Sequence, residues 1–358
     1  MIIKHFLILG AGASYGARGV GTGLPKPPLG ADLAEYLELW LDANNPDNLK
    51  ELERVDMENE RCPNYSSPGL WQDDTDTRLE EFLAKAKKLG FEIAAEELWR
   101  KDRELAKSLN LLMAWSMLTG KSCSFPEHPD RFDNLLQLSD FSDELAVITL
   151  NYDLLLEEAV QRLSAEPDHA YFYPGLSKLT GRIPIFKIHG SINWLQHYPL
   201  ARSASNSVAE RMVRENPPMT LSGPDKVPDT QQEYVPTGER TNLIAELKHD
   251  GSARNPILGI YAPGKPIPYN CKCIGRVRSK CLKIVDENQD ADVTIIGVHI
   301  TKPGDDPRLD EVLDALGGLN GEKRYVGPDE NDRDAADNRG FRADARYLHE
   351  LIKDNDCP

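Results

Sequence analysis

Several features that would place this sequence in other protein classes are missing from it. No hydrophobic run is long enough to span a membrane, and the N-terminus lacks the pattern of a secretory signal peptide. The six cysteines are scattered, unlike the dense spacing of a disulfide-stabilised secreted domain. Lysine and arginine (42) are outnumbered by aspartate and glutamate (58), which argues against a broad surface for nucleic acid. We therefore expect a cytoplasmic protein with neither a membrane nor a direct nucleic-acid partner.

The overall composition is that of a folded globular chain. Hydrophobic residues make up 40% of the sequence and charged residues 28%. A length of 358 residues suffices for one large domain or two ordinary ones. The formal net charge of −16 still permits a local pocket for a phosphate-bearing ligand.

A glycine-rich turn near the N-terminus is the first motif with chemical content. The apolar run Phe6–Leu9 predicts a buried strand, and Gly10 and Gly12 follow it directly. Glycines let a backbone turn tightly and approach a ligand, and amides at the start of a following helix bind anions. With the hydroxyl of Ser14, the pattern is typical of a dinucleotide phosphate site.

This turn departs from the full dinucleotide-binding fingerprint. The third glycine of Gly-x-Gly-x-x-Gly would fall at Tyr15, and no acidic residue is well placed to hold a ribose. A turn whose glycines serve only packing in some α/β protein is the alternative.

Two later strands are also predicted to end in polar residues. The run Leu145–Leu150 is followed by Asn151 and Asp153, and a helix over 154–163 comes next. In open α/β sheets, ligands bind just beyond the carboxyl ends of strands. Asp153 as the N-cap of that helix is the alternative interpretation, and it is compatible with a role in binding.

The second of these strands, Ile185–Ile188, is followed by His189, Gly190 and Ser191. A histidine at the carboxyl end of a strand is well placed to accept a proton. A structural histidine is the alternative.

Hydrophobic periodicity predicts the remaining elements. We expect helices over 31–41, 79–89, 91–118, 130–139 and 306–316, strands over 257–260 and 291–300, a loose acidic segment over 327–337 and a short helix over 342–352.

In their order along the chain, the strand-end motifs resemble those of the Sir2 (sirtuin) superfamily, specifically its bacterial SIR2-like branch. The matching segments are Gly10–Ser14, Thr149–Asp153, Lys187–Trp194 and Val293–Ile300. The resemblance implies an α/β fold, a Rossmann-like parallel sheet with helices on both faces and a helical insertion. The implied domains are 1–40 with 126–325 for binding NAD, 41–125 for the helical insertion, and 326–358 for an acidic C-terminal tail with a short helix.

The resemblance also implies a function and a site. The function is cleavage of the nicotinamide–ribose bond of NAD, with NAD as substrate. The residues implied to bind NAD are Gly10, Ala11, Gly12, Ser14, Ser191 and Gly297. Asn151 and Asp153 are implied to border the nicotinamide ribose, and His189 to act as general base.

Departures from the protein-deacylating members of the superfamily refine this expectation. Leu150 stands where they carry glutamine, and Cys271, Cys273 and Cys281 do not form the two Cys-x-x-Cys pairs of their zinc module. We therefore expect no metal, and we expect hydrolysis of NAD itself to nicotinamide and ADP-ribose, as in bacterial anti-phage defence. A protein deacylase, an ADP-ribosyltransferase and a non-catalytic NAD or ADP-ribose sensor are the alternatives.

An NAD hydrolase that is always active would harm its host. We therefore expect a gate, either self-assembly into a homo-oligomer or a partner such as an ATPase or an Argonaute-type sensor.

Overall fold

The apolar run near the N-terminus forms strand β1 (His5–Leu9), at the centre of the main sheet in the computed structural model. The side chains of Phe6, Leu7, Ile8 and Leu9 are fully buried. Such continuous burial is expected of a parallel strand covered on both faces. The structure describes residues 1–14, 33–35, 37–38, 75–101, 109, 113, 132–133, 135–136, 144–166, 170–175, 181–197, 232–234, 256–258, 272–300, 306–346 and 348–353.

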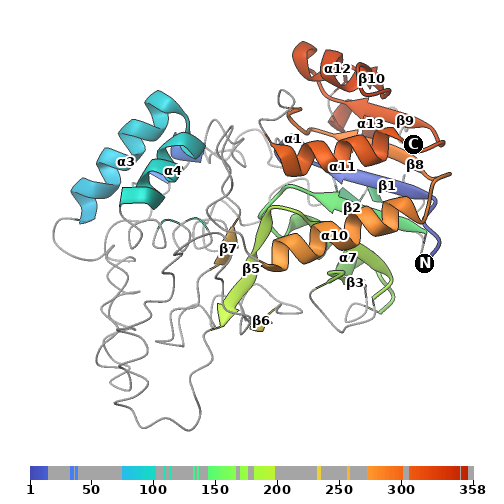
Figure 1. Cartoon of the computed structure of the whole chain (residues 1–358), viewed down its shortest axis with the longest axis horizontal. Coiled ribbons are helices and arrows are strands. Elements are labelled where there is room, and N and C mark those ends of the chain that lie inside the picture. Colours follow the sequence, from blue (N-terminus) through green and yellow to red (C-terminus); the bar gives the residue numbers. More distant parts are fainter. Residues whose placement is uncertain are drawn as a thin grey trace, which may run out of the picture.

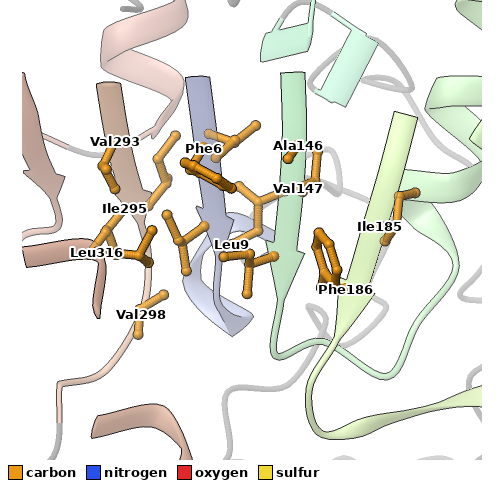
Figure 2. Close-up of a cluster of buried hydrophobic side chains, with 14 of the residues drawn as sticks. Phe6, Leu9, Ala146, Val147, Ile185, Phe186, Val293, Ile295, Val298 and Leu316 are labelled. Atoms are coloured by element: carbon orange, nitrogen blue, oxygen red, sulfur yellow. The ribbon is translucent and has the colours of Figure 1, made fainter. Parts of the chain in front are cut away.

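Within these residues, seven strands form a sheet in which every neighbouring pair is parallel. In sheet order they are β10 (Arg342–Asp344), β9 (Lys323–Val326), β8 (Asp292–Ile296), β1, β2 (Leu145–Thr149), β4 (Ile183–Lys187) and β3 (Tyr171–Phe172). Figure 2 shows the apolar side chains of β8, β1, β2 and β4 packed together in the core. The α/β class and the parallel sheet predicted from the sequence are confirmed.

Helices cover the sheet on both faces. The helix α10 (Lys272–Asp286) and the helix α11 (Pro307–Gly317) lie side by side on one face (Figure 1). The helix α7 (Leu155–Leu163) connects Leu145–Thr149 to Tyr171–Phe172, in the direction along the sheet opposite to the connection that contains α11. Because such crossovers are right-handed, α7 lies on the other face. Other helices whose bounds the structure describes are α1 (Ala11–Ser14), α3 (Thr75–Leu89), α4 (Phe91–Lys101), α12 (Glu330–Asp337) and α13 (Leu348–Lys353).

The strand order reverses beside β1. The chain proceeds from β1 to β2 and then to β3 and β4 on one side, and it returns to β8 on the other side of β1. In open α/β sheets this reversal opens a crevice at the carboxyl ends of the strands, where ligands bind. The topology therefore directs attention to the residues that follow β1, β2, β4 and β8.

A smaller antiparallel sheet begins directly after β4. Its strand β5 (Gly190–His197) pairs with β6 (Gln232–Tyr234) on one side and β7 (Pro256–Leu258) on the other. Gly190 has a φ of 91°, a left-handed conformation that glycine adopts readily and that turns the chain out of the main sheet. The strand expected over 257–260 is confirmed at residues 257 and 258, which lie in β7, and residues 259–260 lie outside the described part; β5 was not predicted.

The local patterns predicted most central elements well. Strands β1, β2, β4 and β8 and helices α7 and α11 lie where the sequence indicated. In α11 the buried residues are Leu309, Val312, Leu313 and Leu316, the set expected from their spacing. Helices α3 and α4 confirm the helical pattern of 79–101, and described residues of 33–38 and 132–136 are helical too. The predicted domain boundaries stay predictions.

The C-terminal prediction was wrong in two places. Residues 327–337 are not loose: Asp329 caps α12, its side chain accepting a hydrogen bond from the amide of Asp332 at 3.1 Å. Residues 342–344 form β10 in the sheet, and the final helix begins only at Leu348. The acidic composition of residues 327–337 led us to expect a loose segment. The cap at Asp329 instead stabilises α12, and pairing with β9 makes residues 342–344 a strand.

None of the helices in the described part of the chain is both long and apolar enough to cross a membrane.

Candidate functional site

The predicted site residues come together at the carboxyl edge of the sheet because their strands are in register. Thr149 of β2 pairs with Lys187 of β4, and Asn151 and His189 each follow two positions later. Leu9 of β1 pairs with Thr149 on one side and with Ile296 of β8 on the other. The turns that begin at Gly10 and Gly297 therefore meet the same edge.

Gly10 is a glycine because the neighbouring strand end leaves no space for a side chain. A Cβ on Gly10 would lie 2.3 Å from the carbonyl oxygen of Gly297 and 2.6 Å from Cα of Val298. The Gly10 amide also donates a hydrogen bond of 3.0 Å to the carbonyl of Ile296. The bare Cα thus allows the ends of β1 and β8 to approach closely, so packing accounts for this glycine whether or not a ligand binds nearby.

Asn151 connects the end of β2 to the glycine turn after β1. Its side-chain amide donates a hydrogen bond of 3.0 Å to the carbonyl of Gly10. Its backbone amide donates to the hydroxyl of Thr149 at 3.1 Å. The side chain is half-buried and held in one place, as a residue that orients a substrate requires.

Asp153 lies one position before the N-cap of α7, which is Leu154. The alternative in which Asp153 is itself the N-cap is therefore wrong by one residue. Its carboxylate nevertheless accepts a hydrogen bond of 3.0 Å from the amide of Leu155, the first residue of the helix. The side chain consequently stabilises the start of α7, beside Asn151.

His189 pairs with a carboxylate that the sequence analysis did not identify. Its Nε2 lies 3.1 Å from Oδ2 of Asp306, and the two side chains are 12% and 4% exposed. Asp306 is the N-cap of α11, where Oδ1 accepts hydrogen bonds from the amides of Arg308 and Leu309. One carboxylate oxygen thus caps a helix while the other holds the imidazole. A carboxylate that orients a histidine is a common support for a general base.

The acidity of Asp306 reflects these contacts. Burial by itself would raise the pKa of this carboxyl. The hydrogen bond and charge of His189, together with the two backbone amide donors, outweigh burial and lower the pKa below its ordinary value. Asp306 is therefore held as a carboxylate and as a hydrogen-bond acceptor for the histidine.

This lowered pKa predicts how stability depends on pH. Because the folded-state pKa lies below the unfolded-state value, Asp306 stabilises the fold fully above the unfolded pKa, and this contribution disappears as the pH falls through the folded pKa. Asp306→Asn keeps a helix cap but loses the charge, so we expect its free energy of unfolding at pH 7 to be lower by about 1 kcal/mol. Urea unfolding from pH 7 to pH 3 should show this difference shrinking below about pH 4.

The exposed Asp286 in α10 supplies the control for that titration. Asp286→Asn should leave the free energy of unfolding nearly unchanged across the same pH range. A difference between wild type and Asp306→Asn that stayed constant down to pH 3 would contradict the assignment.

The other residues predicted to bind NAD also lie at or near this edge of the sheet. Ala11, Gly12 and Ser14 lie in α1, which begins directly after Gly10, so the first amides of this helix lie at the same edge. Ser191 is buried, and its hydroxyl donates to the carbonyl of Tyr152 at 3.4 Å. Gly297, with a φ of 60°, lies at the end of β8, where its amide donates to the carbonyl of Val326 at 3.0 Å.

The cysteines were considered as zinc ligands because three of them lie between 271 and 281. Cys281 lies on the buried face of α10, and burial raises the pKa of its thiol strongly. Cys271 lies outside the described residues. Among the residues that the structure describes, no group of three or more potential metal ligands is found.

Comparison with known protein families bears on the central part of this site. Residues 145–217 match the SIR2-like domain. This segment begins with β2, extends beyond β5 and contains Asn151, Asp153, His189 and Ser191. It covers a minor part of the chain, and Gly10, Gly297 and Asp306 lie outside it. The match supports the relationship to the Sir2 superfamily that the motifs indicated.

A solved structure from a study of the mechanism and regulation of Sir2 enzymes also aligns with the chain. The alignment covers 98% of this chain and 91% of that one, with 12% sequence identity and a TM-score of 0.41. No curated protein sequence matches significantly.

Asp306 is the residue of this site that sequence reasoning missed. The local signal was present, since an aspartate followed by proline is typical of a helix start. Nothing in the sequence indicated that the same carboxylate would meet His189, which lies 117 positions earlier in the chain.

Proposed function

We propose that the carboxyl edge of the sheet binds NAD and that the protein hydrolyses its nicotinamide–ribose bond, giving nicotinamide and ADP-ribose. One observation carries the proposal. Asn151 donates a hydrogen bond to the Gly10 carbonyl, and the paired His189 and Asp306 lie at the same carboxyl edge of the sheet, beside whose central strand the strand order reverses and where open α/β sheets bind nucleotides. The SIR2-like match over residues 145–217 adds support, because Sir2-related proteins use NAD.

The residues at this edge suit a dinucleotide. The diphosphate would lie against the turn from Gly10 to Ser14, where the first amides of α1 offer hydrogen bonds to an anion. The nicotinamide ribose would then lie between the loop of Asn151 and Asp153 and the loop of His189. The shared edge of the strands brings these loops together, and the roles given to them here are those that the resemblance implies.

The chemistry needs positioning and a base. Departure of nicotinamide leaves a ribose with oxocarbenium character, as in glycoside hydrolysis. Asn151, held by Gly10, would orient the ribose and the attacking water, and Asp153 would border the same ribose. His189 would accept the proton of the attacking water while Asp306 holds its ring. Addition of that water completes ADP-ribose.

The test is consumption of NAD by the purified chain, with nicotinamide and ADP-ribose followed as products. Asn151→Ala is expected to lower the kcat about 100-fold, since one pre-positioned polar group is lost from the transition state. The exposed Asn320 gives the matched control, and Asn320→Ala should keep the wild-type kcat.

Products separate the possible reactions. Detection of cyclic or protein-bound ADP-ribose instead of free ADP-ribose would mean that the reaction is cyclisation or transfer rather than hydrolysis. If the protein binds NAD but forms no product, the alternative of a non-catalytic NAD sensor would be favoured.

We also propose that the activity serves anti-phage defence by depleting NAD and that it is gated by homo-oligomerisation or by a partner of the ATPase or Argonaute type. The reason for the gate is that an NAD hydrolase that is always active would harm the host. Measuring turnover against protein concentration, with the mass of the assembly followed in parallel, tests self-assembly. Full activity of the isolated monomer would overturn the gating proposal.

A further inference from the structure

A buried lysine lies directly beneath the candidate site. Lys187 is the last residue of β4, two positions before His189, and its side chain is wholly inaccessible to solvent. Its ammonium lies 2.8 Å from Oε1 of Glu157 in α7, whose side chain is 2% exposed. The hydroxyl of the buried Tyr173 donates to the same carboxylate oxygen at 2.8 Å. Charged groups so deeply buried are rare unless they are paired.

The ammonium of Lys187 has a second acceptor, which belongs to the site. It donates a hydrogen bond to the backbone carbonyl of Asp153. Lys187 therefore connects the end of β4 to the Asn151–Asp153 loop at the end of β2. The neighbouring strand end adds a parallel contact, because the hydroxyl of Ser191 donates to the carbonyl of Tyr152.

Stability alone does not explain this arrangement. Removing two charges from water costs about as much as their attraction returns, and packed apolar side chains often serve the fold equally well. The pair is also incompletely satisfied, since Oε2 of Glu157 is buried and has no hydrogen-bond partner among the described residues. What apolar residues would not supply is a donor aimed at the carbonyl of Asp153.

We propose that Lys187 is a positioning residue that holds the Asn151–Asp153 loop in place beside His189, with Glu157 as its counter-ion. The consequence for NAD cleavage rests on the function proposed above, whereas the hold on the loop does not. Loss of the ammonium removes the hold on the Asp153 carbonyl, so the loop becomes less firmly fixed relative to His189 while the sheet stays folded.

The test variant is Lys187→Met/Glu157→Gln, which removes the ammonium without leaving an unpaired charge and keeps an acceptor for Tyr173. Hydrogen exchange should become about tenfold faster at the amides of Asn151 and Leu155 and stay unchanged in β1 and β8. In the same variant the kcat of NAD cleavage should fall about tenfold or more, with a smaller change in KM.

Tyr173→Phe is the matched control. It removes a hydrogen bond to the same Oε1 of Glu157 but keeps the contact between Lys187 and Asp153. Exchange at Asn151 and Leu155, and the kcat, should both stay within about twofold of wild type. Unchanged exchange in the double variant would overturn the proposal.

Lys187→Gln/Glu157→Gln covers the case in which the first double variant does not fold. Two neutral amides replace the ion pair, so no charge is left buried alone, and the glutamine in place of Lys187 is one bond too short to keep the hydrogen bond to Asp153. Exchange at Asn151 and Leu155 should again become about tenfold faster, and unchanged exchange in this variant would overturn the proposal. If wild type neither binds nor cleaves NAD while the double variant still loosens the loop, the proposed function fails and the positioning role stands.

Discussion

His189→Ala is expected to lower the kcat of NAD cleavage by about two to four orders of magnitude, the usual contribution of a general base. The reason is geometric and chemical together. The imidazole follows the end of β4 and is held by Asp306 at 3.1 Å, so its removal takes away the proton acceptor and leaves the rest of the edge intact. Steady-state release of nicotinamide measures the effect, and calorimetry should show that NAD still binds.

Two companion variants sharpen the measurement. Asp306→Asn keeps the imidazole but loses the carboxylate that holds it, so its loss of kcat should be smaller, about 10- to 100-fold. His5 begins β1 at the opposite end of the strand from Gly10, and His5→Ala should keep the wild-type kcat. A His189→Ala variant with undiminished kcat would remove the histidine from the mechanism.

Gly10→Ala is expected to damage both stability and NAD binding. The added Cβ would lie 2.3 Å from the carbonyl oxygen of Gly297 and 2.6 Å from Cα of Val298, and both are backbone atoms that no rotamer change can move away. The ends of β1 and β8 would have to separate, at a cost of about 1–3 kcal/mol in the free energy of unfolding. Because this junction lies at the proposed diphosphate site, the Kd for NAD should rise about tenfold or more.

Gly275 provides the contrasting substitution. It lies in α10, and a Cβ there would meet nothing within 4 Å. Gly275→Ala should therefore raise the free energy of unfolding by about 0.5–1 kcal/mol, because alanine favours the helix, and should leave NAD binding unchanged. Urea unfolding and calorimetry on both variants make the comparison. Equal effects of the two substitutions would contradict the crowding argument at Gly10.

The elements on which the site is built could be predicted from the sequence because each is specified by short-range order. The run Phe6–Leu9 is wholly apolar, and Leu145–Leu150 and Ile185–Ile188 are apolar except for Thr149 and Lys187, as is typical of strands buried on both faces. The spacing of apolar residues in 306–316 indicates one buried helix face, which α11 shows. Since the carboxyl ends of parallel strands share one edge of a sheet, Asn151 and His189 could be expected together before any coordinates.

Composition was a poor guide where order comes from distant partners. The acidic segment 327–337 contains α12, and 342–344 is a strand because β9 pairs with it. The strand β5 likewise depends on β6 and β7, which follow much later in the chain. Local propensity carries no information about such pairings, so 342–352 was expected to be a short helix and β5 was not predicted.

The sequence by itself determined the α/β class, the central strands, and the motifs Gly10–Ser14, Asn151–Asp153 and His189–Ser191 at their ends. Only the tertiary structure decided how the side chains at that edge are held. The pairing of His189 with Asp306, the hold of Lys187 on the carbonyl of Asp153, and the contact that excludes a side chain at Gly10 each join residues far apart in the chain. Apolar periodicity is a local property, whereas a hydrogen bond between two distant loops exists only after the sheet has brought them together.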